Sequence, residues 1–202
     1  MIDLWQIERE LQNDNDTSLC GVDEAGRGPL AGPVIAAAVI LPLGIEIPGL
    51  GDSKKLTEKQ RESLYDEIKA IATAYAIGQA TAEEIDQINI LEATYLAMNR
   101  AIGGLDPPPD LCLIDGNRAT GIKYANKCIV GGDGLCASIA AASILAKVHR
   151  DRLMQDLHQS HSQYGFDRHK GYPTKAHYAA LDAHGPSSVH RQTFLRKWYK
   201  GK

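Results

Sequence analysis

The sequence is organised by the stretch Cys20-Gly21-Val22-Asp23-Glu24-Ala25-Gly26-Arg27-Gly28-Pro29-Leu30-Ala31-Gly32-Pro33. It begins with apolar, strand-like residues, reaches two adjacent carboxylates, and passes through a glycine-rich turn to an apolar run at 34–41. Adjacent strand residues point to opposite faces of a sheet. Asp23 and Glu24 therefore serve one site only if the strand ends or bulges there, or if one of them acts through its backbone carbonyl. An acidic pair by itself is usually a solvated turn, but glycines here allow a sharp bend and close approach of backbone N–H groups to a ligand.

Size and composition indicate an ordinary globular protein. The 202 residues, 44% hydrophobic and 23% charged, suit one domain or one domain with a small appendage. No apolar run is long enough to cross a membrane and no signal-peptide pattern opens the chain, so we expect a cytoplasmic location. Cysteine occurs only four times and never as Cys-x-x-Cys, which favours buried or incidental thiols over a metal site.

Charge is distributed unevenly along the chain. From residue 147 to the end there are eleven Lys and Arg against four Asp and Glu, and all seven histidines lie there, although the net charge of the whole chain is −3. Such polarity fits an acidic metal site beside a surface for a polyanion. The alternative is a basic C-terminal segment without a partner.

Hydrophobic periodicity and capping residues predict a mixed α/β fold in which the first two strands pair locally. Capping boxes at Thr57 and Thr81 open two helices, the second with a buried stripe of Ile85, Ile88, Leu91, Tyr95 and Met98. The expected strands are 18–23, 34–41, 73–80, 111–114 and 124–130, and the expected helices are a short one within 1–16 and then 57–70, 81–102, 138–157, 174–184 and 187–199.

Three acids share a context that predicts a metal site. Asp23 and Asp115 each end a strand, and Asp133 lies in a glycine turn before the long buried helix. Strand ends converge on one crevice in open α/β sheets, where carboxylates repel one another unless cations hold them. Oxygen ligands without histidine suit Mg²⁺ or Mn²⁺, and two such ions about 4 Å apart support phosphodiester cleavage.

Several long motifs, in order, resemble bacterial ribonuclease HII, the type 2 ribonuclease H. The similarity runs from about residue 18 to residue 195. The matching segments are the opening stretch, Asp52-Ser-Lys-Lys-Leu, Leu-Ile-Asp115-Gly, Gly-Gly-Asp133 with Ser138-Ile-Ala-Ala-Ala-Ser143-Ile-Leu-Ala-Lys147-Val-x-Arg-Asp151, and Tyr164-Gly-Phe-x-x-His169-Lys-Gly-Tyr172-Pro-Thr.

The resemblance implies a ribonuclease H-like fold, a mixed five-stranded sheet flanked by helices. It implies a catalytic core at 1–146 and a basic helical segment at 147–202 packed on it as one catalytic unit. The implied activity is endonucleolytic cleavage of the RNA strand of RNA–DNA hybrids and incision 5′ to single ribonucleotides embedded in duplex DNA. The ends would be 3′-hydroxyl and 5′-phosphate, with a role in DNA replication and repair. The 22 residues before Asp23 leave no room for the long N-terminal domain of the related ribonuclease HIII.

The family's motifs also imply the site residues. Its four catalytic and metal-binding acids fall on Asp23, Glu24, Asp115 and Asp133, with Asp23 the best candidate to bridge two Mg²⁺ or Mn²⁺ ions. The substrate-binding residues implied or inferred around them are Gly26, Arg27 and Gly28 for the 2′-hydroxyl and its flanking phosphate, Tyr172 against the ribose, Lys54 and Lys55 on phosphates, and Lys147, His169 and Arg191 along the duplex. We also expect the Ser143 hydroxyl to bond the backbone of its own helix.

The C-terminal stretch Gln192–Tyr199 loosely fits a sliding-clamp ligand motif, although the same residues would pack a terminal amphipathic helix onto the core. We expect a monomer. Two functions of other classes stay open at this point: a nucleic-acid-binding protein that does not cut, and a different two-metal nuclease. The four acids count against the first, and Gly26, Arg27, Gly28 and Tyr172 count against the second, because only RNA has a 2′-hydroxyl to recognise.

Overall fold

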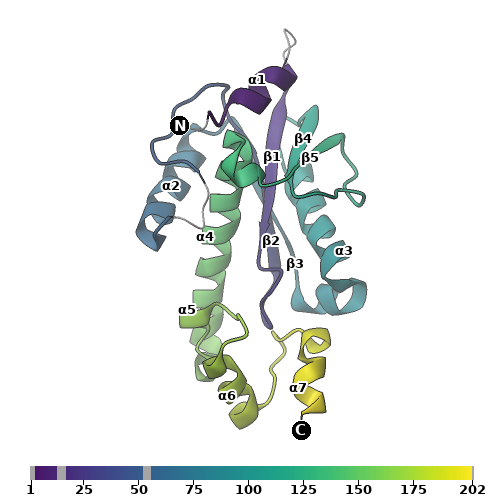
Figure 1. The fold of residues 1–202 in the computed structure, drawn as a ribbon. Helices are drawn as coiled ribbons and strands as arrows, with labels where there is room; N and C mark the ends of the chain where they lie inside the picture. The colour runs from purple at the N-terminus through teal and green to yellow at the C-terminus, as the bar shows by residue number, and fades with distance from the viewer. Residues whose placement is uncertain (1–2, 13–16, 52–55, 202) are drawn as a thin grey trace.

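The computed structural model describes residues 3–12, 17–51 and 56–201, which form a five-stranded sheet in the order β3-β2-β1-β4-β5 (Figure 1). β1 is antiparallel to β2, and β2 to β3, whereas β1, β4 and β5 are parallel. The mixed sheet and the local pairing of the first two strands are confirmed. The strands are β1 Leu19–Ala25, β2 Val34–Ile40, β3 Ala74–Ala80, β4 Leu111–Asp115 and β5 Asn126–Ile129.

Helices cover both faces of this sheet. α3 packs on one face, and α4 with α2 packs on the other. None of the helices in the described ranges is long and apolar enough to span a bilayer. The α-helices are α1 Gln6–Gln12, α2 Glu58–Ile71, α3 Ala82–Gly103, α4 Ala137–Ser160, α5 Phe166–His169, α6 Lys175–His184 and α7 Arg196–Lys200, with 3-10 turns η2 Gly132–Gly134, η3 Ser162–Tyr164 and η4 Gln192–Leu195.

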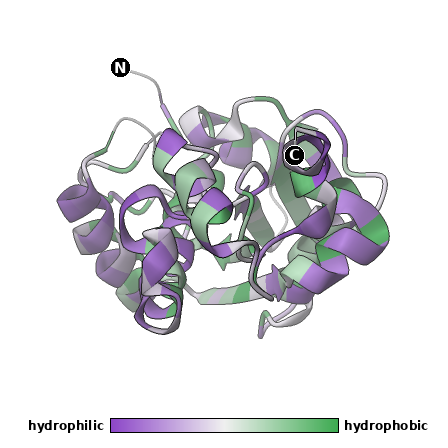
Figure 2. Cartoon of the chain, turned by 90° about the horizontal axis from the view of Figure 1, so that it is seen from below, coloured by the Kyte–Doolittle hydropathy of each residue, from purple (hydrophilic) through white to green (hydrophobic). Residues whose placement is uncertain are grey.

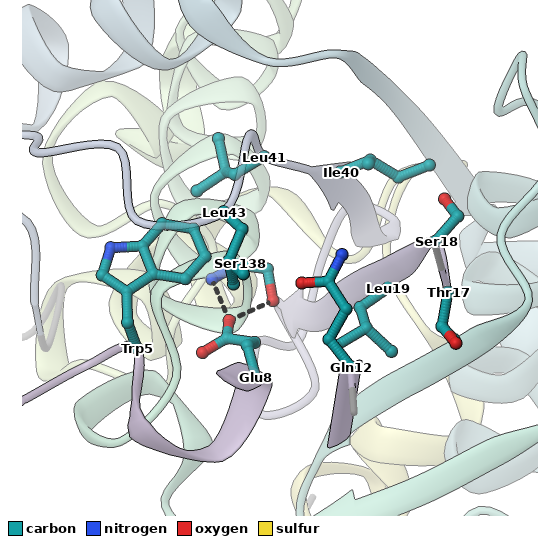
Figure 3. Close-up of a pocket in the computed structure, with 10 residues that line it drawn as sticks. All are labelled: Trp5, Glu8, Gln12, Thr17, Ser18, Leu19, Ile40, Leu41, Leu43 and Ser138. Carbon is teal, nitrogen blue, oxygen red and sulfur yellow. Dashed lines mark hydrogen bonds between the residues drawn. The ribbon is translucent and has the colours of Figure 1, made fainter. Parts of the chain in front are cut away.

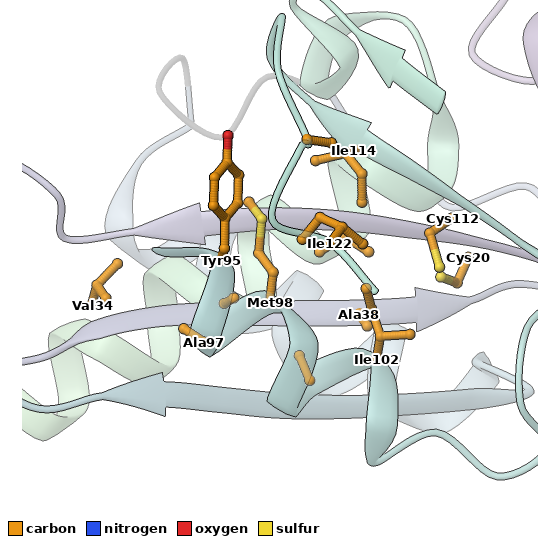
Figure 4. Close-up of a cluster of buried hydrophobic side chains, with 14 of the residues drawn as sticks. Cys20, Val34, Ala38, Tyr95, Ala97, Met98, Ile102, Cys112, Ile114 and Ile122 are labelled. Atoms are coloured by element: carbon orange, nitrogen blue, oxygen red, sulfur yellow. The ribbon is translucent and has the colours of Figure 1, made fainter. Parts of the chain in front are cut away.

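The central position of β2 explains its composition. Every residue of Val34–Ile40 is buried, because even residues face α3 and odd residues face α4, so the strand is apolar without alternation. Figure 4 shows the α3 face, where Met98 and Ile102 lie over the sheet and Cys20 of β1 meets Cys112 of β4. All four cysteines are free thiols, as expected. In Figure 2 the outer helices carry most of the hydrophilic residues.

Both predicted capping boxes are present, at Thr57 before α2 and at Thr81 before α3. The predicted stripe on α3 is wrong at Ile88, which is 38% exposed. The helix is interrupted at the next residue, because Asn89 has φ +68° and its side chain accepts hydrogen bonds from the N–H groups of Leu91 and Glu92. Asn89 therefore caps a second helical segment, and Ile88 lies at the break.

α4 lies along β1 at unusually short range. A Cβ built on Gly21 would lie 2.1 Å from the carbonyl carbon of Ser138, so only glycine fits there. The Cys136 side chain does not cap α4, and the buried Glu8 carboxylate accepts from the N–H and hydroxyl of Ser138 instead, at 2.9 and 2.8 Å (Figure 3). The expected division after residue 146 falls inside this continuous helix.

The C-terminal segment differs from the predicted helix over 187–199. Residues 187–191 are extended or turned, and only η4 and α7 are helical. Gly32 N–H donates to the Val189 carbonyl at 2.9 Å, and Arg191 N–H donates to the Leu30 carbonyl at 2.8 Å. Pairing with the loop after β1 therefore replaces helix formation. A third hydrophobic cluster around Phe166 and Leu195 joins this segment to the end of α4.

Candidate active site

The predicted acids of two strands meet at one edge of the sheet. In the parallel pair, Val22 of β1 is level with Ile114 of β4, so Asp23 and Asp115 are the next residues of their strands. Asp23 lies opposite Ala37, a residue of the α4-side core, and Asp115 has the same orientation as Leu113, which packs on that side. Both carboxylates therefore leave the sheet towards α4.

Asp23 is a strongly perturbed acid. It is only 6% exposed, and its pKa is raised well above the ordinary value, first by burial and then by the nearby charges of Glu24 and Asp115. The Glu24 N–H donates to its Oδ1 at 2.7 Å, and the Ser143 side chain also hydrogen-bonds to it. The bond from Ser143 to the acid joins α4 to β1, while the expected bond to its own helix backbone stays a prediction. A cation at this position would relieve both the burial and the repulsion.

Glu24 leaves β1 on the opposite face. It pairs with Ala36 of the α3-side core, and β1 keeps its regular register with β2 as far as Ala25. The strand does not bulge at the acidic pair, but its pairing with β4 stops at Val22. Glu24 therefore stands where the sheet edge opens, and its Oε1 lies 3.3 Å from Nη1 of Arg27.

These side chains line one groove of about 310 Å³. Three of the four predicted acids line it together with the glycine turn and Tyr172. The lining residues are Asp23, Glu24, Ala25, Gly26, Arg27, Gly28, Arg61, Asp115, Ser143, Lys147 and Tyr172. The groove thus combines two walls. The acidic wall is formed by Asp23, Glu24 and Asp115, and the other wall by the glycine turn, the basic Arg27 and the aromatic Tyr172.

Asp133 lies beside the groove rather than in its lining. It is 7% exposed in η2, and the N–H of the preceding residue, Gly132, donates to Asp115 Oδ1 at 2.7 Å. The turn therefore binds the second strand-end acid and holds Asp133 next to it. This is the convergence expected from the glycine turn, with the backbone making the direct contact.

The donor set fits a hard divalent cation that brings its own water. Within the described ranges, no three His, Cys, Asp or Glu side chains converge closely enough to enclose an ion by themselves. Mg²⁺ commonly binds through one or two carboxylates, several waters and substrate phosphates rather than in an all-protein cage. The adjacent Asp23 and Asp115, supported by Glu24, supply ligands of that kind.

Two buried arginines, Arg150 and Arg191, pack against the Gly-Arg-Gly turn. Gly26 has φ +97°, and a Cβ there would lie 2.1 Å from Arg150 Nε. Arg150 is 1% exposed and donates to the carbonyls of Ala31, Pro33 and Lys170 at 3.1–3.2 Å. A guanidinium has five donors in a rigid fork, which allows it to bond several carbonyls at once.

Arg191 performs the same task on the other side of the turn. It is fully buried and donates to the carbonyls of Gly26 at 2.6 Å, Arg27 at 3.0 Å and Gly32 at 2.9 Å. This placement differs from the expected contact along the duplex. The backbone carbonyls of a glycine-rich turn are invisible to sequence reasoning, so a buried arginine in a basic segment was assigned to the surface.

Tyr172 stands against the same turn. It is 42% exposed, and a Cβ on Gly28 would lie 3.7 Å from its Cε1, so the ring and the glycine face each other. The Leu30 N–H donates to the Gly171 carbonyl at 2.8 Å, which joins the two loops. The exposed ring and the exposed glycine backbone therefore form one continuous surface at the groove.

The remaining predicted contacts are scattered. Lys147 lines the groove and pairs with Asp151 at 2.7 Å, whereas the ring of His169 is bound to the Tyr164 carbonyl at 2.7 Å within its own loop. Lys54 and Lys55 lie outside the described residues. The sequence analysis missed Arg61 of α2, which lines the groove; its only signal was its position shortly after the Asp-Ser-Lys-Lys-Leu motif.

The residues of the clamp-like motif are engaged with the protein itself. Leu195 is fully buried, Trp198 Nε1 donates to Asp182 at 2.9 Å, and the Tyr199 hydroxyl donates to Gln192 Oε1 at 2.7 Å. The segment thus packs on the core through Leu195, but as a 3-10 turn followed by the short α7 rather than as one amphipathic helix, and Tyr199 is 46% exposed.

Comparison with known proteins gives a consistent result. The family model described as Ribonuclease HII matches residues 20–201. Proteins named Ribonuclease HII from Burkholderia mallei and Dechloromonas aromatica are 58% and 57% identical to this chain over 176 residues, which are 87% of this chain and 82% and 90% of theirs.

Solved structures share the fold. The ribonuclease H2 from Pyrococcus horikoshii superimposes with a TM-score of 0.74 and 28% identity, over 92% of this chain and 98% of that one. The RNase HII of the PCNA:RNase HII complex from Archaeoglobus fulgidus has a TM-score of 0.69 at 24% identity, covering 86% and 93%. A Bst-RNase HIII in complex with Mn²⁺ has a TM-score of 0.64 at 19% identity, covering 88% and 64%.

Proposed function

This chain belongs to the ribonuclease HII family, and we propose that the carboxylate groove is the site at which it performs the family's reaction. It is a metal-dependent endoribonuclease that cleaves RNA in RNA–DNA hybrids and incises at ribonucleotides embedded in DNA. The observation that carries the assignment is that one groove holds Asp23, Glu24 and Asp115 together with Gly26–Gly28 and Tyr172. Chemistry and recognition of the ribose thus share one surface.

Asp23, Glu24, Asp115 and Asp133 are the proposed ligands of two Mg²⁺ or Mn²⁺ ions. When bound, such ions activate a water and stabilise the charge on the leaving oxygen of a phosphodiester. Asp23 is the proposed bridge between them, because it is the most buried and most crowded of the acids. Its hydrogen bonds from the Glu24 amide and the Ser143 side chain hold the carboxylate in one orientation.

The opposite wall is proposed to recognise the ribose. The exposed Gly28 leaves its backbone accessible to the 2′-hydroxyl, the buried Gly26 lines the groove and shapes the turn beside it, and the half-exposed Arg27 can bind the flanking phosphate. Tyr172 packs on the sugar from the facing side. The proposed incision lies 5′ to the ribonucleotide and leaves 3′-hydroxyl and 5′-phosphate ends.

The test is cleavage of a labelled DNA duplex that carries one ribonucleotide, with Mg²⁺, with Mn²⁺ and with EDTA, beside an all-DNA duplex. We expect a metal-dependent cut 5′ to the ribonucleotide only, ending in 3′-hydroxyl. Cutting of both duplexes would discard the role given to the glycine turn and Tyr172. Absence of cutting in folded protein with either metal would refute the assignment of the groove.

Further phosphate contacts are proposed for Lys147, which lines the groove, and for Lys54 and Lys55. The monomeric state and the cytoplasmic location stay predictions. Sliding-clamp binding through Gln192–Tyr199 would require the packed Leu195 to leave the core. Loss of clamp binding on Trp198→Ala in folded protein would support that contact, and a pull-down without any clamp would end it.

A further inference from the structure

A chain of hydrogen bonds between histidines ends on the backbone of Tyr172. The Ser187 N–H donates to Nδ1 of His190 at 3.0 Å, so this nitrogen is an acceptor and the proton of the neutral ring is on Nε2. His190 Nε2 lies 3.0 Å from Nε2 of His177, and Nδ1 of His177 lies 3.0 Å from the Tyr172 carbonyl. With both rings neutral, His190 donates to His177 and His177 donates to Tyr172.

The surroundings keep both rings neutral. His177 is fully buried and His190 is 2% exposed, and burial lowers the pKa of both, that of His190 to about 4. His169 stacks on His177 with ring centroids 4.6 Å apart, so an additional positive charge there would be unfavourable. The chain therefore has one direction at neutral pH, from Ser187 to the Tyr172 carbonyl.

Arg191, the residue that follows His190, holds the Gly26–Gly28 turn that faces Tyr172. Arg191 binds the carbonyls of Gly26, Arg27 and Gly32, while His190 pairs with Ala31 in an isolated β-bridge. Arg191 thus bonds directly to the Gly26–Gly28 turn, and His190 reaches Tyr172 through His177. The turn and Tyr172 are the two groups proposed to flank the ribose.

We propose that His190 and Arg191, acting with His177, are positioning residues that set the separation between the Gly26–Gly28 turn and Tyr172, and so the discrimination of a single 2′-hydroxyl. The inference rests on the proposed function of the groove. A single embedded ribonucleotide offers one 2′-hydroxyl and requires that separation to be correct. An RNA–DNA hybrid offers many 2′-hydroxyls. Displacement of the turn or of Tyr172 therefore lowers kcat/KM on the hybrid less.

The experiment measures kcat and KM on a single-ribonucleotide duplex and on an RNA–DNA hybrid for His177→Leu and Arg191→Lys. We expect each variant to lower kcat/KM on the single ribonucleotide on the order of tenfold more than on the hybrid. His177→Asn, which keeps a donor near the Tyr172 carbonyl, should recover part of the loss. His184→Leu is the matched control, because this exposed residue of α6 meets only the edge of Tyr164.

A double-mutant cycle separates positioning from general destabilisation. In a Tyr172→Ala background the ring to be positioned is gone, so His177→Leu should cause no further change in the ratio of the two substrates. An equal loss on both substrates, or the same change of ratio in the Tyr172→Ala background, would overturn the inference. If His177→Leu does not fold, His177→Asn and Arg191→Lys decide by the same ratio. Wild-type protein that does not cut the single-ribonucleotide duplex would instead refute the proposed function.

Discussion

The two walls of the groove are the acidic wall, with Asp23 and Asp115, and the recognition wall, formed by the turn at 26–33. They are held in place in different ways. Asp23 and Asp115 are placed by the backbone ladder of β1 and β4, where register alone makes them level. The turn at 26–33 has no ladder, and its carbonyls are held by the side chains of Arg150 and Arg191. The acidic wall is therefore fixed by main-chain pairing within the sheet, whereas the turn depends on two buried side chains in addition to the main-chain bonds of Leu30 and Gly32.

The difference predicts different consequences of substitution. Asp23 is buried beside like charges, so the acidic wall costs stability that a neutral residue would recover. Each buried arginine, by contrast, donates to two buried carbonyls and one part-buried carbonyl, and the buried pair would lose these donors on its removal. Changes in the acidic wall should separate activity from stability, whereas changes in the recognition wall should lower both.

The largest effect is expected from Asp23→Asn. Loss of the proposed metal-bridging charge removes several kcal/mol of transition-state stabilisation, so cleavage should fall about 10³-fold or more. Because the amide is neutral, the free energy of unfolding should rise by about 1 kcal/mol. Cleavage assays and thermal melts check both, with Asp66→Asn, an exposed acid of α2, as the control. Retained cleavage would contradict the bridging role.

Removal of an arginine under the turn should have the next largest effect. Arg150→Met removes the donor to two buried carbonyls and one part-buried carbonyl and should lower the free energy of unfolding by about 4 kcal/mol. Arg152→Met, two residues along α4, breaks an exposed ion pair with Glu62 and a cation–π contact with Tyr65, and should cost about 1 kcal/mol or less. Urea denaturation of both variants measures the difference. Equal costs would mean that Arg150 is not what holds the turn.

Gly26→Ala tests the turn from its own side. The change introduces a side chain at φ +97° and a Cβ 2.1 Å from Arg150 Nε, so we expect a loss of about 3 kcal/mol with reduced cleavage. Gly44→Ala shares the positive φ, at +78°, but meets nothing within 4 Å, and should cost about 1 kcal/mol with normal activity. Similar losses of stability for Gly26→Ala and Gly44→Ala would show that backbone strain alone, and not the contact with Arg150, determines the cost.

The smallest effect is a pH dependence of stability. His190 has a pKa of about 4 in the folded protein, against about 6.5 in the unfolded chain, so the unfolded chain binds the proton first as pH falls. Stability should therefore decrease by about 2 kcal/mol between pH 7.5 and pH 5. The lowered pKa of His177 contributes to the pH dependence in the same direction, and His161 and His169 are the neighbouring groups that act on this pair. The raised pKa of Asp23 contributes in the opposite direction.

Melts in the Asp23→Asn background isolate the histidines from that opposing acid. His190→Gln in the same background should flatten the dependence, because the titrating ring is absent. An unchanged slope would place the proton uptake elsewhere.

The sequence alone was sufficient wherever the signal is local. The unbroken apolar run of β2, the capping boxes at Thr57 and Thr81, and the position of Asp115 at the end of β4 are all visible in short windows, whereas β1 continues two residues beyond the expected end at Asp23. The motifs of the opening stretch also predicted the family, which the comparisons confirm. Such features depend on periodicity, on hydrogen bonds a few residues apart, or on residue order.

Only the tertiary structure decided what distant segments do to one another. The Ser143 side chain bonds Asp23 of another element, and the Arg191 side chain bonds the carbonyls of the turn at 26–33 rather than lying along a duplex. The predicted terminal helix gave way to pairing with residues 30–32. The physical reason is common to all three. A polar side chain or a strand edge takes whichever partner the fold brings within reach, and a backbone carbonyl more than a hundred residues away leaves no mark on the sequence near it.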